Sequence, residues 1–408
     1  MRLKLLDGLK VIQVGETVSS AFCGKVLADT GADVVMVEPP GEGNFTRRLP
    51  PYYEDTPGLE RSVLHNWLNS NKRGITLKLQ DKEGRAILYD LVRQTDMLIE
   101  GLWNNGKIKQ GLNYDELKEV NQRLIITSIT PFGRQGPYAD YHSSELTLFS
   151  MSGFDFYLSS PVDDPLNTPP RQNAGHQVSM VAGLVAATAT QWGFLTRERK
   201  GKGLVIDISE WEAFTSLLFE QTGYYSDGAL VSERKRDPSA GITAAGGLIW
   251  CLPCSDGWII ISPREDHQFK RWSEVMGNPE WTLREVFSTP ESRKEHAWEI
   301  YELSASWTVM QKKDEVFKKA QEKKVPCFPI SLMKDLLRLE QLEHRGFWIT
   351  MEHPIIKGLT YPGLPMKTNG ESVSFRPAPL LGEHTSEVCR ELGISSEKLK
   401  TLFRLGII

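Results

Sequence analysis

The most constraining feature of this sequence is an alternation between strand-like and helix-like hydrophobic patterns from Leu9 to Ser128. Leu9 to Val14 and Asp33 to Glu38 are dense apolar runs typical of buried strands, and a helical pattern separates them. The alternation continues with a helix, a strand, a helix and a strand at residues 82–94, 96–99, 114–121 and 124–128. Strands that alternate with helices predict a mainly parallel sheet, covered on both faces, that binds ligands at the carboxyl ends of its strands. We therefore expect an α/β fold with a Rossmann-like large domain.

The rest of the chain changes pattern twice. A polar stretch over 159–170 contains four prolines and predicts a loop over a site, followed by a long helix over 176–196 and a strand over 204–208. Beyond Gly223, a hairpin over 247–262 and several charged, Trp-rich helices predict a smaller α+β domain. Because 408 residues exceed a single ordinary core, we predict a large domain over 1–218, a small domain over 219–330, and a C-terminal segment, 331–408, that returns to the large domain.

Composition narrows the class of protein. A formal net charge of −4, with 25% charged and 40% hydrophobic residues, fits an ordinary globular enzyme and argues against a nucleic-acid scaffold. The five cysteines form no disulfide-dense pattern, and Met1 to Val14 lacks the apolar core and cleavage site of a signal peptide. The longest weakly polar run, Met180 to Leu195, is shorter than the ~20 residues of a membrane helix. We expect a cytoplasmic protein that binds neither nucleic acid nor membrane.

Two familiar cofactor motifs are incomplete. Glu38 ends a strand where an acidic residue can bind a ribose hydroxyl, but Gly15 to Ser20 lacks the further glycines of a dinucleotide site. Cys251 and Cys254 have the spacing of a redox motif, yet they lie in a predicted hairpin rather than at a helix N-terminus. Cys327 has no neighbouring ligand that would complete a zinc site. The sequence therefore predicts buried structural cysteines, no metal and no permanently bound cofactor.

A pair of cations precedes a strand-like segment near residue 75. Lys72 and Arg73 follow Asn71 on a tight turn, which suits a diphosphate because charge-assisted hydrogen bonds to phosphate are strong. Lys107 and Lys109, farther along, would extend the same positive rim. The alternative is an ordinary solvated basic turn.

Several segments, in order along the chain, resemble family III CoA-transferases, the carnitine and bile-acid CoA-transferase family. In the N-terminal part they are Leu6 to Val11, Leu27 to Val34, Val37 to Gly41 and Asn69 to Arg73. Later segments are Phe132 to Pro137, Gly203 to Ser209 before Glu212-Ala213, and Ala378 to Thr385. The resemblance runs from residue 6 to about residue 393. It rests on several separate motifs in the same order, which is more specific than any one of them.

This resemblance implies a fold, an assembly and an activity. The large domain would be built from both chain ends with the small domain between them, and two chains would form an obligate interlocked dimer. The protein would move CoA between carboxylic acids, so its substrates would be an acyl-CoA and a carboxylic acid. By resemblance, CoA would contact Thr17, Val18, Ser19, Asn71, Lys72, Arg73 and Lys109, the last in the place of a family cation.

The catalytic position departs from the family pattern. Members use an aspartate that attacks the thioester, and Asn173 stands in its place, although an amide cannot form the required mixed anhydride. Relatives that racemise 2-methylacyl-CoA pair the same aspartate with a histidine, whose place Ser144 takes. Glu145 and His176 are the remaining acid/base candidates near the thioester. Their ordinary roles would be a cap or ion pair for Glu145 and a helix start for His176.

Three functions follow from these features. The favoured one is a family III CoA-transferase, or the aspartate-lacking subunit of a heteromeric one. The benzylsuccinate enzyme of this family pairs two related but different chains, so the chain would form a homodimer or a heteromer whose partner carries the aspartate. The second is an acyl-CoA isomerase or racemase that uses Glu145 or His176. The third, from a different class, is a CoA-thioester-binding protein without turnover.

Overall fold

The computed structural model describes residues 5–102, 112–157, 162–164, 167–169, 174–228, 247–368 and 374–408. The chain divides into two compact units. The larger unit comprises 1–159, 170–232 and 344–408, and the smaller one comprises 160–169 and 233–343. Both chain ends thus contribute to the larger unit, while residues 219–232 belong to the larger unit and 331–343 to the smaller one.

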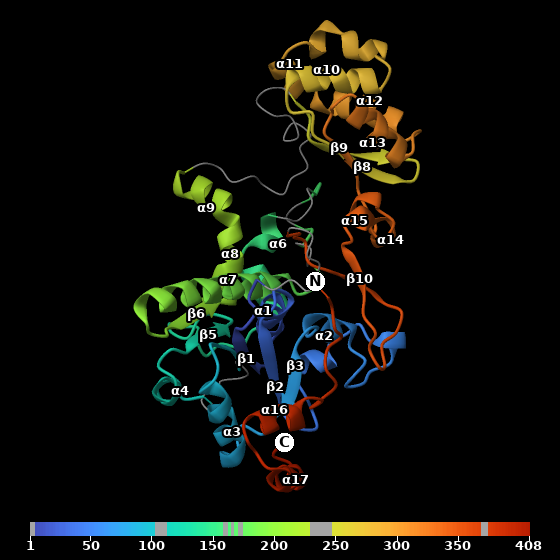
Figure 1. Cartoon of the computed structure of the whole chain (residues 1–408). Coiled ribbons are helices and arrows are strands. Elements are labelled where there is room, and N and C mark those ends of the chain that lie inside the picture. The colour runs from blue at the N-terminus through green and yellow to red at the C-terminus, as the bar shows by residue number, and fades with distance from the viewer. Residues whose placement is uncertain are drawn as a thin grey trace. The chain divides into compact units, whose positions relative to one another are not determined.

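A six-stranded, fully parallel sheet forms the centre of the larger unit (Figure 1). Its strands are β1 (Lys10–Gly15), β2 (Asp33–Glu38), β3 (Arg73–Thr76), β4 (Met97–Gly101), β5 (Ile125–Thr130) and β6 (Val205–Ser209). They lie in the order β3-β2-β1-β4-β5-β6, so the predicted α/β fold with a Rossmann-like parallel sheet is confirmed. The strand order reverses between β1 and β4, and in open parallel sheets the crevice at that point is where ligands bind.

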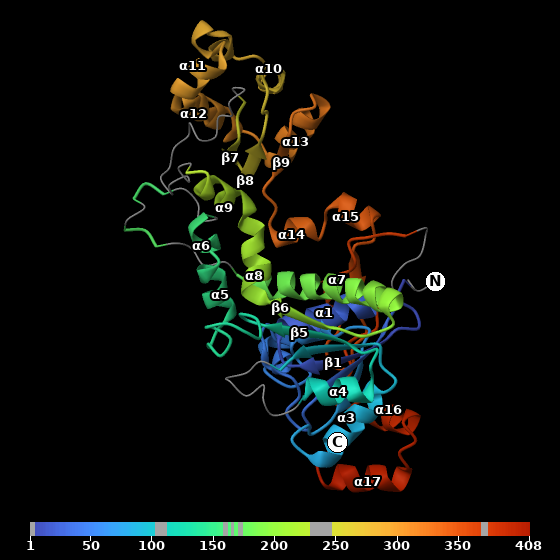
Figure 2. The ribbon, with the colours of Figure 1, turned by 90° about the vertical axis from the view of Figure 1, so that its left-hand side faces the viewer.

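Helices cover both faces of this sheet, which parallel strands require because they are apolar on both sides. On one face, α1 (Val18–Asp29) and α7 (Gln177–Lys200) pack on a core that includes Val11, Met97 and Ile125. On the other face, α3 (Lys82–Val92), α4 (Tyr114–Val120), α16 (Thr385–Glu391) and α17 (Ser396–Arg404) share a core with Ile12 and Leu98. Figure 2 shows the two helical layers on opposite sides of the strands. Adjacent residues of one strand, such as Val11 and Ile12, therefore supply different cores.

The tight packing of α7 on α1 depends on Gly183. A Cβ atom added there would lie 2.6 Å from the Ser19 carbonyl oxygen and 3.0 Å from the Phe22 Cβ. By length and composition, α7 is the one helix in the described part of the chain that could cross a membrane. Its residues Ala182, Ala186 and Ala187 are buried in the larger unit, whereas Leu184, Trp192 and Leu195 are exposed.

The smaller unit contains an antiparallel three-stranded sheet and several helices. The sheet consists of β7 (Trp250–Cys254), β8 (Gly257–Ile261) and β9 (Cys327–Pro329), so the predicted hairpin is confirmed. Its longer helices are α10 (Asp266–Val275), α12 (Ala297–Thr308) and α13 (Lys313–Glu322). Cys254 and Cys327 are buried as predicted, but the prediction for Cys251 was wrong because the strand pleat points its side chain outward, to the exposed face.

Shorter elements complete the two units. The remaining helices are α2 (Val63–Leu68), α5 (Glu145–Met151), α6 (Phe154–Tyr157), α8 (Glu210–Thr215), α9 (Phe219–Ser226), α11 (Pro290–Glu295), α14 (Met333–Leu336) and α15 (Glu340–His344). A two-stranded antiparallel ribbon consists of β10 (Trp348–Thr350) and β11 (Thr360–Pro362).

We predict that Gly183→Ala lowers the free energy of unfolding by about 1–3 kcal/mol, because the added methyl group collides with the backbone of α1. Chemical denaturation of the full chain measures the change. Gly223→Ala in α9 is the matched control, since an added Cβ there meets nothing within 4 Å. That control should be neutral or stabilising by up to about 1 kcal/mol, as for glycine replaced in a helix. Equal effects of the two substitutions would contradict the packing argument.

Candidate active site at the carboxyl edge of the sheet

The turn from β1 into α1 lies at the point where the strand order reverses. The Thr17 side chain caps α1 by accepting a hydrogen bond from the Ser20 amide. Gly101 at the end of β4 lies directly against this turn, since a Cβ there would approach Thr17 Oγ1 and Ser20 Oγ to 2.7 Å. The turn is thus held closely against the neighbouring strand, with the positive end of the α1 dipole at the sheet edge. Of the predicted CoA contacts here, Thr17 is half-buried, whereas Val18 and Ser19 are buried.

Ser19 reaches a buried carboxylate that the sequence did not single out. Its hydroxyl donates a hydrogen bond to Glu210 Oε1, and Glu210 is the first residue of α8, directly after β6. Ser19 is fully buried and Glu210 is 6% exposed. Burial raises the pKa of the Glu210 carboxyl to about 7, the Ser19 hydroxyl opposes the rise, and the nearby Glu145 carboxylate adds to it. Such a group, with a pKa near neutral and beside the turn that was predicted to contact CoA, is a candidate for catalysis.

Glu145 caps the long helix α7. Its Oε1 accepts from the Val178 amide at 2.7 Å, and its Oε2 accepts from the Ser179 amide at 3.2 Å and the Ser179 hydroxyl at 2.7 Å. A carboxylate at a helix N-terminus is stabilised by the free amides and by the dipole. The structure therefore gives Glu145 the capping role named above as its ordinary alternative. Glu145 itself follows Ser144, whose side chain caps α5.

His176 is the residue that precedes α7. It occupies the N-cap position, is half-buried, and makes no side-chain capping hydrogen bond. The structure thus brings His176 and Glu145 to the same helix end. Asn173, the predicted position of the family aspartate, and Lys109, a predicted CoA contact, lie outside the described residues.

The predicted basic turn is largely buried. Lys72 is 3% exposed, and its Nζ donates to Gln13 Oε1, the Ala21 carbonyl and Asn69 Oδ1, each at 2.7 Å. Burial, together with the neighbouring Lys25 ammonium, lowers the pKa of Lys72 well below its ordinary value. The Lys72 ammonium therefore points into the protein rather than toward solvent.

Asn71 and Arg73 are also engaged by protein groups. The Asn71 side chain donates to Asp29 Oδ1 at 2.7 Å. Arg73 begins β3 and forms ion pairs with Asp33, at the start of β2, and with Glu387 and Glu391 of α16. Because β2 and β3 are parallel, these starting residues lie at the amino ends of the strands. The structure therefore does not bring the Arg73 guanidinium together with Ser19 at the carboxyl ends.

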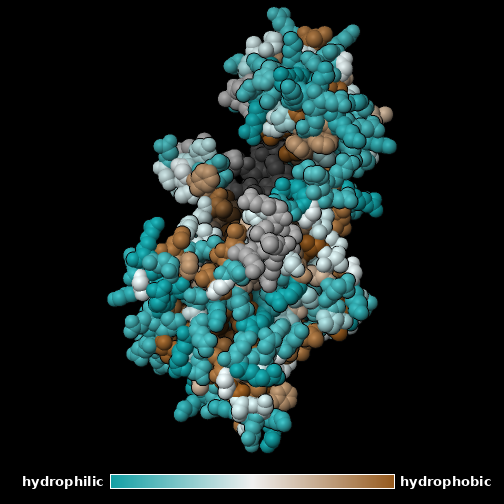
Figure 3. Space-filling view, viewed as in Figure 1, coloured by the Kyte–Doolittle hydropathy of each residue, from teal (hydrophilic) through white to brown (hydrophobic). Residues whose placement is uncertain are grey.

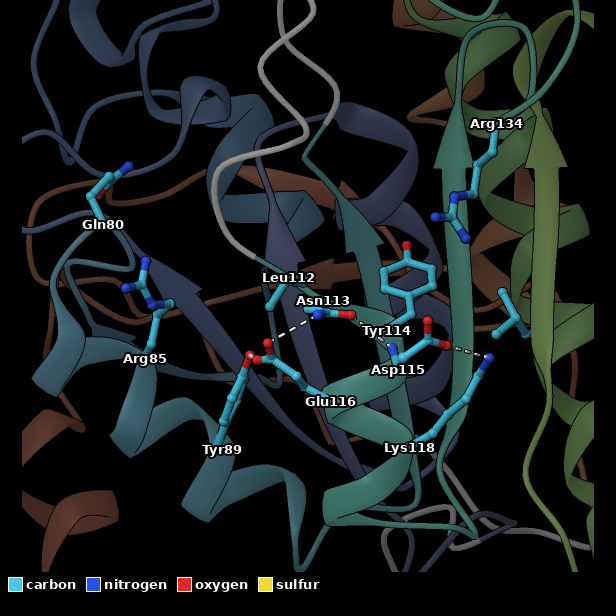
Figure 4. A pocket seen from close by; sticks show the side chains of 11 residues that line it. Gln80, Arg85, Tyr89, Leu112, Asn113, Tyr114, Asp115, Glu116, Lys118 and Arg134 are labelled. Carbon is cyan, nitrogen blue, oxygen red and sulfur yellow. Dashed lines mark hydrogen bonds and ion pairs between the residues drawn. The ribbon is translucent and has the colours of Figure 1, made fainter.

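A large polar cavity lies against the α3 and α4 face of the sheet (Figure 4). It has a volume of about 1030 Å³. Its lining includes Gln80, Arg85, Tyr89, Leu112, Asn113, Tyr114, Asp115, Glu116, Lys118, Arg134 and Val205. The Arg134 guanidinium lies over the Tyr114 ring at 4.0 Å from its centroid, and the Tyr114 hydroxyl donates to Glu100. Three cations and an aromatic ring around one cavity can hold phosphates and a heterocyclic base.

Sequence reasoning did not assign a role to this cavity, although Arg134 lies within a motif, Phe132 to Pro137, that was noted as characteristic. Glu38 was considered for ribose binding, but Arg47 forms an ion pair with its carboxylate at 2.7 Å.

Among the described residues, no group of three or more His, Cys, Asp or Glu side chains is arranged to hold a metal ion.

Comparison with known proteins agrees with this architecture. Residues 6–385 of this chain match the sequence model of CoA-transferase family III. The chain is 31% identical over 402 residues to succinyl-CoA:(R)-benzylsuccinate CoA-transferase subunit BbsE of Thauera aromatica. The aligned region covers 95% of this chain and 94% of the relative. It is 30% identical to the succinate–glutarate CoA-transferase of Agrobacterium fabrum, covering 95% of both chains.

Solved structures show the same fold. A CAIB/BAIF family protein from Brucella suis superposes with a TM-score of 0.82 at 29% identity, covering 96% of this chain and all of that one. The protein Rv3272 of Mycobacterium tuberculosis superposes with a TM-score of 0.77 at 20% identity, and covers 95% of this chain. The match along almost the whole sequence, together with the shared fold, establishes that this chain belongs to CoA-transferase family III.

Proposed function

We propose that this protein transfers CoA between two carboxylic acids, as an enzyme in its own right or as the aspartate-lacking subunit of a heteromeric enzyme. The observation that carries the proposal is the family match over residues 6–385. The relatives at about 30% identity are named as CoA-transferases acting on different acids, which supports the reaction type but not a particular acyl group. The substrates are then an acyl-CoA and a carboxylic acid, with no permanently bound cofactor, and the compartment is the cytoplasm.

The arrangement of charges supports one orientation of CoA. In this orientation the thioester lies at the turn of Thr17, Val18 and Ser19, and the phosphates and adenine extend into the cavity beside Arg134. Arginine forms two parallel hydrogen bonds with a phosphate, and its stacked position on Tyr114 fixes the guanidinium plane. In this orientation the turn from Asn71 to Arg73 has a structural role, because its side chains already bind other protein groups. Lys109 stays a proposed phosphate contact.

An apolar surface on α7, on the turn Ser216–Leu218 that follows α8, and on α9 supports an assembly of two chains. Large hydrophobic side chains exposed there are Leu184, Val185, Trp192, Leu195, Leu217, Phe219, Tyr224 and Tyr225. Figure 3 shows brown, apolar surface where Figure 1 draws α7 and α8. Contiguous exposed apolar surface is typical of a protein interface. We propose that a second chain covers it in an interlocked dimer, which is a homodimer or a heteromer with a related subunit that carries the aspartate.

The alternative of an acyl-CoA isomerase or racemase rests on Glu145 and His176 as acid and base. Both Glu145 oxygens accept hydrogen bonds at the start of α7, so proton transfer by Glu145 would uncap that helix. This geometry favours the transferase. A binding protein without turnover is the outcome if CoA binds but no CoA exchange is detected.

We predict that Arg134→Ala weakens CoA binding about 10- to 100-fold, since a charge-assisted phosphate contact contributes about 1.5–3 kcal/mol. Isothermal titration of the full chain with CoA measures the affinity. Arg93→Ala is the matched control, because Arg93 is an exposed cation at the C-cap of α3 that pairs with Asp90 and does not line the cavity. Unchanged affinity in Arg134→Ala together with a loss in Arg73→Ala would place the phosphates at the basic turn instead.

We predict that Lys72→Met lowers stability more than it lowers CoA affinity. The substitution leaves the Gln13 and Asn69 side-chain oxygens and the Ala21 carbonyl without their shared donor, at a cost of about 1–3 kcal/mol for each buried group left unsatisfied. Chemical denaturation and CoA titration of the same preparation separate the two effects. A folded variant of unchanged stability that no longer binds CoA would show that Lys72 contacts the ligand.

We predict that Asn173→Asp gains a covalent CoA adduct at residue 173. A carboxylate can attack the thioester, whereas the amide of the natural residue cannot. Peptide mass spectrometry after incubation with succinyl-CoA and hydroxylamine locates the resulting hydroxamate. The wild-type peptide that contains Asn173 should stay unmodified and serves as the control. A variant that binds CoA but stays unmodified at residue 173 would show that this position is not beside the thioester.

A further inference from the structure

Glu210 is a buried carboxylate for which no structural partner of opposite charge is found among the described residues. It is 6% exposed and receives the Ser19 hydroxyl on Oε1. The buried Glu38 carboxylate, in contrast, is paired with Arg47, and Glu145 accepts three hydrogen bonds at the start of α7. Burying a carboxylate without a cation is costly, so a purely structural residue at this position would gain stability by being apolar.

The position of Glu210 follows directly from the parallel sheet. Because β6 pairs in parallel with β5, the residue after β6 lies at the same carboxyl edge as the turn after β1. Ser19 spans the gap between these two loops through its hydrogen bond. The backbone of Ser19 is held in position by α7, because Gly183 of that helix packs directly on the Ser19 carbonyl. Glu210 thus lies beside the turn to which the proposed function assigns the thioester.

We propose that Glu210 is the catalytic carboxylate of this chain and carries CoA covalently during transfer, with Ser19 holding it in place. The inference rests on the proposed function, because it needs an acyl-CoA at the turn from Thr17 to Ser19. It assigns to Glu210 the nucleophilic role that Asn173 cannot fill, so the chain needs no carboxylate from a partner.

The reaction balances without an external proton or electron. A Glu210 oxygen attacks the thioester carbonyl; the new C–O bond forms a mixed anhydride and the C–S bond breaks, releasing CoA thiolate. The thiolate then attacks the Glu210 carbonyl carbon, which expels the donor acid as a carboxylate and leaves a glutamyl-CoA thioester. The acceptor carboxylate repeats these steps in reverse, taking CoA away and restoring the Glu210 carboxylate.

The groups around Glu210 determine the pH range in which its carboxylate can attack the thioester. The groups identified around the carboxylate are Ser19 of α1, whose hydroxyl favours the ionised form, and Glu145 of α5, which opposes ionisation. Since the nucleophile must be ionised and burial raises the pKa of Glu210 to about 7, the rate of adduct formation should increase as the pH rises through about 7. Below that pH the protonated acid is unreactive, which the pH profile of adduct formation measures.

The test is to locate the modified residue in the wild-type protein itself. Full-length wild type, Glu210→Gln and Glu212→Gln are mixed with succinyl-CoA, then treated with hydroxylamine, which converts an enzyme thioester or anhydride into a hydroxamate. Tandem mass spectrometry of the peptides identifies the modified residue. We expect a hydroxamate on Glu210 of the wild type, none in Glu210→Gln, and an unchanged yield in Glu212→Gln. Glu212 is the matched control because it is an exposed glutamate on the same helix.

Two further measurements, CoA titration and the exchange of labelled succinate into succinyl-CoA, test the transferase function separately from the catalytic role of Glu210. A wild type that binds CoA and exchanges label, but whose hydroxamate lies on another residue or whose Glu210→Gln variant exchanges normally, overturns the role of Glu210 and leaves the transferase intact. A wild type that binds CoA without exchange or adduct also overturns it. A wild type that does not bind CoA overturns the proposed function and this inference together. The wild-type mapping does not depend on the folding of a variant.

Discussion

The direct packing of α7 on α1 determines the geometry of the sheet's carboxyl edge. A parallel sheet must be covered on both faces, and on this face two helices share the space. Gly183 allows their backbones to approach so closely that a single methyl group would collide with the Ser19 carbonyl. This close contact holds the first turn of α1 against α7, and in that position the Ser19 hydroxyl donates a hydrogen bond to Glu210. The start of α7 is fixed in turn by Glu145.

Three carboxylates of the larger unit, the buried Glu38 and Glu210 and the half-buried Glu145, are stabilised in three different ways. Glu38 is matched by the Arg47 guanidinium, which also pairs with Glu60. Glu145 is matched by amides and the helix dipole at the start of α7. Glu210 receives the Ser19 hydroxyl, and its pKa is raised to about 7. Glu38 and Glu145 thus have positive or amide partners, whereas Glu210 has a single hydroxyl donor and a raised pKa, which makes it a candidate functional group.

The fold was largely predictable because it follows from local periodicity. The strands at Lys10–Gly15 and Asp33–Glu38, the helix at Gln177–Lys200 and the hairpin after Trp250 were all expected within a few residues. The site was less predictable. Lys72 was predicted to bind a diphosphate from a tight turn, yet its ammonium is buried and donates to Gln13, which lies far away in the chain, and to the nearby Asn69. Glu210 was overlooked because one glutamate after a strand has no distinctive local pattern.

The sequence by itself determined the alternation of strands and helices, the mainly parallel class of the larger unit's sheet, and the order of motifs that marks the family. These depend on residues close together in the chain, where hydrophobic period and turn chemistry act directly. Only the tertiary structure decided that Lys72 points inward, that Glu145 caps α7, and that Ser19 meets Glu210 across an interval of 191 residues. Burial and electrostatic environment arise from groups brought together by folding, so no local pattern contains them.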